Sequence, residues 1–128
     1  MVDELTDEIK KAGAELIQRM DARGFPPDAA FWLYDQESEM WKLVIAEANT
    51  AGSGPKKGYR QIQKLLGQPA PGIEGVTLAD ISLVTPSFPL VLLLGRVVKT
   101  PPGISGIRFR NNVVNGTVIQ DAYIYRLR

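Results

Sequence analysis

The dipeptide Asn115-Gly116 restricts the fold of this chain more than any other short stretch. It lies between two runs of β-forming residues, 106–114 and 117–127. A type I′ turn needs positive φ at both central positions, and Asn-Gly adopts that conformation most readily. The sequence therefore predicts a β-hairpin over these two runs, in which Val114 pairs with Thr117.

Alternation of side chains along the two strands then divides the hairpin into two faces. The predicted core face carries Ile107, Phe109, Val113, Val118, Ala122 and Ile124. The other face carries Arg108, Arg110, Asn112, Asp121, Tyr123, Tyr125 and Leu127. On that face we expect Arg110 opposite Asp121 and Arg108 opposite Tyr123. A one-residue slip would exchange the two faces, and a bulge near Gln120 is the irregularity that would cause it.

Apolar residues at helical spacing predict three helices in the rest of the chain. The first spans residues 3–22 with Asp3 as its N-cap, and the second spans residues 55–66. The third spans about residues 89–100, with Ser87 as its N-cap. Because the third helix is apolar on nearly every side, we expect it to be buried between layers or in a subunit contact.

Runs of β-forming residues predict three further strands, over residues 29–34, 40–46 and 78–84. The first two flank a short polar loop and form a second hairpin, with Trp32 and Trp41 on one side of it as core residues. The order of elements is α-β-β-α-β-α-β-β. This order predicts a single α+β domain over residues 1–128, a mainly antiparallel sheet of about five strands with three helices packed on it.

The composition restricts the chemistry of the protein. The 128 residues include no cysteine and no histidine. Disulfides, thiolate nucleophiles and the commonest metal ligand and general base are therefore absent. The N-terminal segment is acidic rather than a secretory signal, and the longest apolar run, 90–94, is too short to span a bilayer. We predict a cytoplasmic protein with no cofactor, no metal and no membrane partner.

Basic residues gather in two places that suit an anion. Residues 51–128 hold ten Lys and Arg against three Asp and Glu, whereas residues 1–50 hold five against eleven. A glycine-rich loop before the second helix, and the polar face of the last hairpin, resemble sites for phosphate and for stacked bases. The candidate anion-binding or nucleic-acid-binding residues are Lys56, Lys57, Arg60, Arg108, Arg110, Tyr123 and Tyr125. The alternative is a solvated helix face and ordinary cross-strand pairs, with the charges mixed in space.

Acidic residues offer a different possibility. Carboxylate chemistry needs no histidine, and a pocket lined by two or more of a small set of acids would favour an enzyme. The set is Asp35, Glu39, Glu47, Asp80 and Asp121. Their spacing matches no catalytic or metal-binding motif, and the residues as a whole favour a protein without catalytic activity.

The leading hypothesis is a small non-catalytic binding or regulatory module whose partner is another protein or a second copy of itself. It depends on the missing catalytic side chains, on the apolar third helix and on the exposed edges of an open sheet. A nucleic-acid-binding module that uses the basic and aromatic hairpin face is the first alternative. A carboxylate-dependent enzyme without His or Cys is the second.

Overall fold

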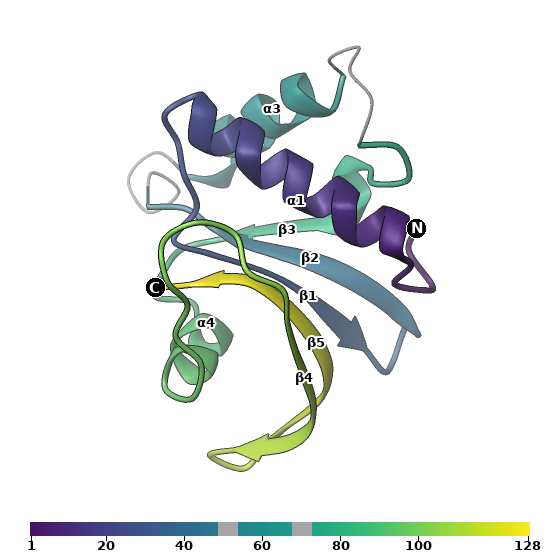
Figure 1. The fold of residues 1–128 in the computed structure, drawn as a ribbon, viewed down its shortest axis with the longest axis vertical. Coiled ribbons are helices and arrows are strands. Elements are labelled where there is room, and N and C mark those ends of the chain that lie inside the picture. Colours follow the sequence, from purple (N-terminus) through teal and green to yellow (C-terminus); the bar gives the residue numbers. More distant parts are fainter. Residues whose placement is uncertain (49–53, 68–72) are drawn as a thin grey trace.

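The computed structural model describes residues 1–48, 54–67 and 73–128. Within them, five strands form one sheet in the order β3-β2-β1-β5-β4, and α1 and α3 lie on one side of it with α4 on the other (Figure 1). The elements are α1 (Asp7–Ala22), β1 (Ala29–Asp35), β2 (Met40–Ala46), α3 (Pro55–Leu66), the short 3-10 helix η1 (Leu78–Asp80), β3 (Ile81–Val84), α4 (Pro89–Gly95), β4 (Ile107–Val114) and β5 (Thr117–Leu127). The predicted α+β class and element order are confirmed.

The sheet is mixed, because β3 pairs in parallel with β2 while the other neighbours are antiparallel. A parallel pair needs a crossover connection, which is usually a helix. The segment between β2 and β3 contains α3, which packs on α1, η1 and β3. The prediction of a mainly antiparallel sheet is therefore correct, with one parallel pair at the β3 edge. Among the described residues, no helix has both the length and the apolar composition to cross a membrane.

Each face of the sheet buries its own apolar core. The core under α1 and α3 contains Leu16, Ile17, Met20, Trp32, Leu43 and Ile62. The core under α4 contains Phe31, Leu94, Ile119, Ala122 and Ile124. Trp32 and Trp41 both belong to the first core, as the alternation in their hairpin predicted. Three layers therefore make up the domain.

The first helix begins four residues later than its sequence predicts. Its N-cap is Thr6, whose hydroxyl accepts a hydrogen bond from the Ile9 backbone N–H at 3.2 Å, so Asp3 is not the cap. The preceding residues are not helical because Val2 forms an isolated bridge with Trp41 of β2. The Trp41 N–H donates to the Val2 carbonyl at 2.8 Å. A pairing distant in sequence thus overrides the local helical pattern.

The third helix is shorter than predicted and is capped differently. It ends at Gly95, and Phe88 rather than Ser87 is its N-cap residue. The Ser87 hydroxyl instead lies 2.9 Å from the Thr85 hydroxyl. Beyond the helix, the Leu127 N–H donates to the Thr100 hydroxyl at 2.9 Å, which draws the chain into an extended path beside β5. The predicted strand over 78–84 is shorter for a similar local reason, because a capping box between Thr77 and Asp80 makes its first residues a 3-10 turn.

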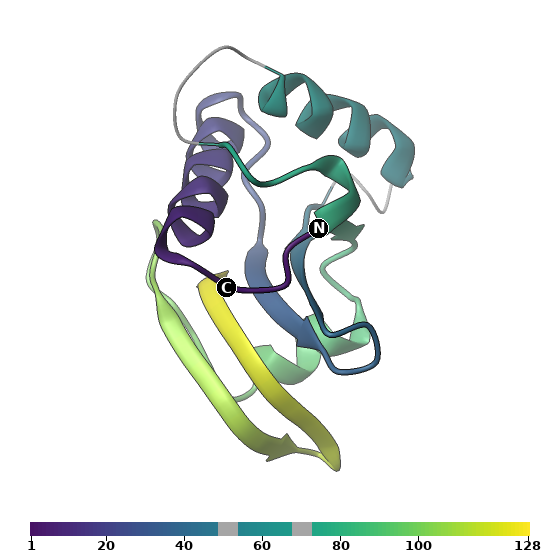
Figure 2. The same ribbon diagram turned by 90° about the vertical axis from the view of Figure 1, so that its right-hand side faces the viewer.

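The last hairpin has the predicted register, but the predicted core face holds for only half of its length. Pairing passes from Arg110–Asp121 directly to Asn112–Ile119, over Asn111 and Gln120. Asn111 has φ of 49°, in the left-handed region, so the alternation of both strands shifts by one residue there. The tip reaches beyond the helices in both views (Figure 1, Figure 2). Beyond the shift, the buried residues are Val114 and Ile119, while Val113 and Val118 are exposed.

A second irregularity lies near the end of β5. The pairing of β1 with β5 shifts by one residue between Ala30 and Phe31, which leaves Tyr125 as an extra residue. Tyr125 packs in the core under α1, whereas Leu127 packs in the core under α4. The prediction that these two residues share one face is therefore wrong, because a bulge changes the direction of the side chains that follow it.

Candidate binding surfaces

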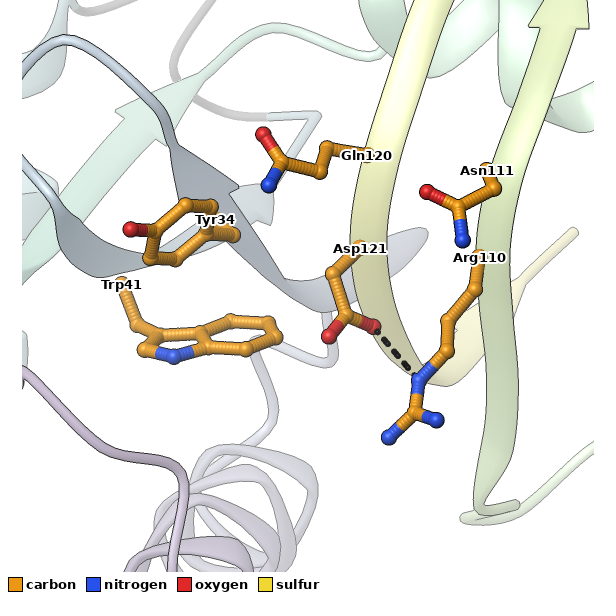
Figure 3. A pocket seen from close by; sticks show the side chains of 6 residues that line it. All are labelled: Tyr34, Trp41, Arg110, Asn111, Gln120 and Asp121. Carbon is orange, nitrogen blue, oxygen red and sulfur yellow. Dashed lines mark ion pairs between the residues drawn. The ribbon is translucent and has the colours of Figure 1, made fainter.

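One candidate site is a polar pocket of about 270 Å³ on the α1 side of the sheet (Figure 3). The pocket lies where the alternation of β4 and β5 shifts, next to the end of β1 and the start of β2. The lining residues are Tyr34, Trp41, Arg110, Asn111, Gln120 and Asp121. The two rings form one wall, and the side chains of β4 and β5 form the other (Figure 3).

Asp121 is the electrostatic centre of the polar pocket. It accepts two hydrogen bonds from Arg108, both at 2.6 Å, and its carboxylate lies 3.5 Å from Arg110 Nε. Partial burial by itself would raise the pKa of Asp121, but the hydrogen bond and charge of Arg108, together with the charge of Arg110, lower it overall. The same hydrogen bond raises the pKa of Arg108. Two guanidinium groups therefore surround one carboxylate.

Aromatic rings complete this side of the sheet. The rings of Tyr34 and Trp41 meet edge to face with centroids 5.5 Å apart. The Arg108 guanidinium lies over the Trp41 ring, 5.5 Å from its centroid, while it also binds Asp121. Arg108 thus has its planar face and its hydrogen-bond donors both engaged. Arg110, whose side chain is 58% exposed, is the arginine that faces solvent.

The two predicted tyrosines differ in what they can reach. Tyr125 is 1% exposed, and its hydroxyl bonds to Trp32 and to the backbone of Lys10. It presents no free ring face to a base. Tyr123 is half-buried, and the Lys10 ammonium lies over its ring, 5.0 Å from the centroid. Helix α1 therefore covers this part of the hairpin face.

The basic residues of the second helix lie elsewhere. Lys56, Lys57 and Arg60 are exposed on α3, which packs against β3, whereas Arg108 and Arg110 belong to β4. Strands β3 and β4 are the opposite edges of the sheet. The predicted basic residues therefore do not gather into one surface. Part of the glycine-rich loop before α3, at residues 52–53, lies outside the described residues.

The five candidate acids are also separated. The polar pocket holds Asp121 and a hollow beside α4 holds Asp35, so neither groups two of them. Asp80 is buried and accepts hydrogen bonds from the backbone and the hydroxyl of Thr77, at 2.8 and 3.1 Å. Glu47 is buried just after β2, and Glu39 is exposed in the turn before it. Among the described residues, no three acidic, His or Cys side chains form a group able to hold a metal ion.

A second candidate site lies on α4. We call Phe88 and Leu92, which are one helical turn apart, the α4 ridge; their exposed fractions are 40% and 54%. Leu94 of the same helix is fully buried and Val91 nearly so, which fixes the opposite side of α4 against the sheet. A helix of seven residues is about 10 Å long. It therefore covers only part of the apolar face beneath it.

Hollows flank the α4 ridge on both sides. The apolar hollow, of about 430 Å³, is lined by Phe88, Pro89, Leu90, Leu93 and Thr117. An adjoining hollow of about 350 Å³ shares Leu90 and Thr117 and extends to Leu33 and Val118. A third hollow, of about 310 Å³, lies on the other side of Leu92, and we call it the basic groove because Arg96, Lys99 and Arg128 line it. Apolar side chains thus extend from the ridge to the hairpin tip.

Several of these residues were not predicted to belong to any site. Adjacent asparagines at 111 and 112, a residue type that tolerates positive φ, were the signal for the shift in β4. Phe88 and Leu92 have the spacing of one helical turn, but their exposure depends on how α4 sits on the sheet.

The fold thus defines an α+β domain with a polar pocket on one face and an exposed apolar helix on the other. Comparisons with protein-family models, with curated proteins and with solved structures find no match to this chain. Its function is therefore inferred from the geometry of its own surfaces.

Proposed function

We propose that this chain is a non-catalytic binding module whose partner is another protein, held on the α4 ridge. The exposure of Phe88 and Leu92, side by side on one helix, is the observation that carries the proposal. Contiguous exposed apolar residues beside hollows are typical of protein interfaces. Val118, which is 68% exposed, lines the adjoining hollow and extends the apolar surface toward the hairpin tip.

The α4 ridge fits this role better than the polar pocket does. Phe88 and Leu92 are 40% and 54% exposed, so a partner that covered them would contribute roughly half of the ~1.5–3 kcal/mol that full burial of such a side chain gives. The hollows on either side would accept side chains from a partner. In the polar pocket, by contrast, Arg108 and Asp121 already satisfy each other.

A photo-crosslinking experiment tests the proposal. The photoreactive residue p-benzoylphenylalanine is placed at Leu92, or at the exposed Gln18 of α1 as the matched control, in cells that express the full chain. We expect discrete covalent adducts from position 92 and none of the same mass from position 18. Light scattering of the purified protein then distinguishes a second copy from a different partner. Identical adduct patterns at both positions would contradict a binding site on α4.

A nucleic-acid ligand is the second candidate, favoured by the exposed guanidinium of Arg110, which lines the polar pocket together with the amide side chains of Asn111 and Gln120. Such binding would weaken as salt is added, because phosphate contacts release counterions. Titration of a short fluorescent single strand at low salt tests it, with Arg110→Ala as the variant. Absence of binding at low salt would remove this candidate.

A further inference from the structure

The basic groove beside the α4 ridge combines charge with an apolar wall. Arg96, Lys99 and Arg128 line it together with Val91 and Leu92. These residues come from α4, from the segment after it and from the residue that follows β5. The Arg128 backbone N–H donates to the Asp28 carbonyl at 3.2 Å, which holds Arg128 at the groove.

The cations of the basic groove are not neutralised by neighbours. Among the described residues, none of Arg96, Lys99 and Arg128 forms an ion pair. Asp28 is the one carboxylate side chain among the residues that line the groove. The three cations are exposed, so they keep their hydration and remain available to a ligand. The groove is therefore a positively charged site with an apolar wall.

The apolar hollow lies on the other side of the α4 ridge. Phe88 belongs to that hollow and Leu92 to the basic groove, so the α4 ridge connects the two. Phe88, Pro89, Leu90 and Leu93 line the apolar hollow, whereas Arg96 and Lys99 follow the C-terminal end of α4 at Gly95. A ligand that crosses the ridge from the apolar hollow would meet apolar side chains first and then the positive charge of the basic groove.

We propose that the partner presents a segment that carries an apolar anchor and, across the α4 ridge from it, an acidic residue. The anchor occupies the apolar hollow, and the carboxylate pairs with Arg96 and Lys99 in the basic groove. The inference rests on the proposed function, because it describes what the same α4 ridge recognises.

The charge pattern selects an acidic peptide rather than another anion. A nucleic acid strand would pair with the cations but would leave Phe88 and Leu92 uncovered. An anionic lipid surface shares both features, and the experiment separates it. Charged residues at the border of an apolar interface mainly control association rate and partner choice. The acidic residue is therefore expected to determine which apolar segments bind.

The experiment selects binders of the full chain from a display library of random 16-residue peptides. Selected peptides are synthesised with a fluorophore, and their dissociation constants are measured by anisotropy at two salt concentrations. Three variants are compared with the unaltered chain. They are Leu92→Ser, the double variant Arg96→Glu/Lys99→Glu, and the double variant Lys57→Glu/Arg60→Glu, which makes the same charge change on the exposed surface of α3.

We expect selected peptides to be enriched in Asp or Glu near an apolar residue. Their affinity should fall about tenfold or more in Arg96→Glu/Lys99→Glu, and less than about twofold in Lys57→Glu/Arg60→Glu. Leu92→Ser should abolish binding. Peptides without acidic enrichment, or with equal affinity for both double variants, would overturn this inference and leave the proposed function intact.

Other outcomes separate the two proposals. Peptides whose binding is unaffected by Leu92→Ser, or a selection that yields no peptide, would overturn both. Sedimentation with vesicles of phosphatidylserine and phosphatidylcholine tests the lipid surface. The basic groove would be assigned to lipid instead if two results were found together. Arg96→Glu/Lys99→Glu would have to abolish vesicle binding, and the same variant would have to leave peptide binding unchanged.

Discussion

Trp32 Nε1 donates a hydrogen bond to the Tyr125 hydroxyl at 2.9 Å, between two side chains that are at most 1% exposed. The same hydroxyl donates to the Lys10 carbonyl at 2.6 Å. Burial raises the pKa of Tyr125, so the hydroxyl stays protonated and can act as this donor. A continuous chain of hydrogen bonds therefore runs from β1 through the bulge of β5 to α1. It fixes the position of α1 over the hairpin.

Tyr125→Phe is predicted to lower the free energy of unfolding by about 1–3 kcal/mol, because it leaves the buried Trp32 N–H without its acceptor. Denaturant titration followed by tryptophan fluorescence measures the change. Tyr123→Phe is the matched control on the same strand and should change the free energy of unfolding by less than about 0.5 kcal/mol. Equal effects of the two variants would contradict a specific role for the Tyr125 hydroxyl.

Gly13→Ala is predicted to destabilise the protein, although alanine has the higher helix propensity. A Cβ at Gly13 would collide with the Tyr125 hydroxyl and would lie 2.9 Å from Trp32 Nε1. Overpacking of this kind costs about 1–3 kcal/mol. Gly95→Ala at the end of α4 is the control, because a Cβ there meets no described atom within 4 Å. Thermal unfolding should show a lower midpoint for the first variant and an unchanged or higher midpoint for the second.

Asp21 and Arg126 form the principal ion pair between α1 and β5. Arg126 is 1% exposed and donates to both oxygens of the Asp21 carboxylate, at 2.9 and 2.8 Å. Asp21→Asn should cost about 1–3 kcal/mol of stability, because it leaves a buried guanidinium short of its counter-charge. Asp7→Asn, in the exposed pair with Lys10 at 3.8 Å, should cost under about 1 kcal/mol. Chemical denaturation measures the free energy of unfolding of both variants. Equal losses in the two would contradict the claim that the burial of Arg126 makes its ion pair more important for stability.

The lowered pKa of Asp121 predicts a dependence of stability on acid. A carboxyl whose pKa is lower in the folded state stabilises the fold above its unfolded value, which is about 3.9 for aspartate. That contribution is lost as the pH falls from about 4 through the folded pKa. Asp121→Asn should therefore be less stable than the unaltered chain at pH 6, and the difference should shrink below about pH 4. Asp3→Asn, exposed before α1, is the control, and a constant difference across this range would contradict the prediction.

Much of the local structure followed from neighbouring residues in the sequence. Asn115-Gly116 determined the register of the last hairpin, because a two-residue turn leaves one way to pair the strands that it joins. The order of elements, and the common side of Trp32 and Trp41, followed from alternation and helical spacing. These features depend on backbone geometry within a few residues, which the sequence expresses directly.

Tertiary structure decided what the local pattern leaves open. Val113 and Val118 are exposed because the alternation of both strands shifts at Asn111 and Gln120. Ile119 instead packs in the core under α4. The burial of Tyr125 depended on a bulge formed against β1. The exposure of Leu92 depended on which side of α4 packs on the sheet. Each of these outcomes is set by contacts between segments far apart in the chain, where burial of apolar surface outweighs local alternation.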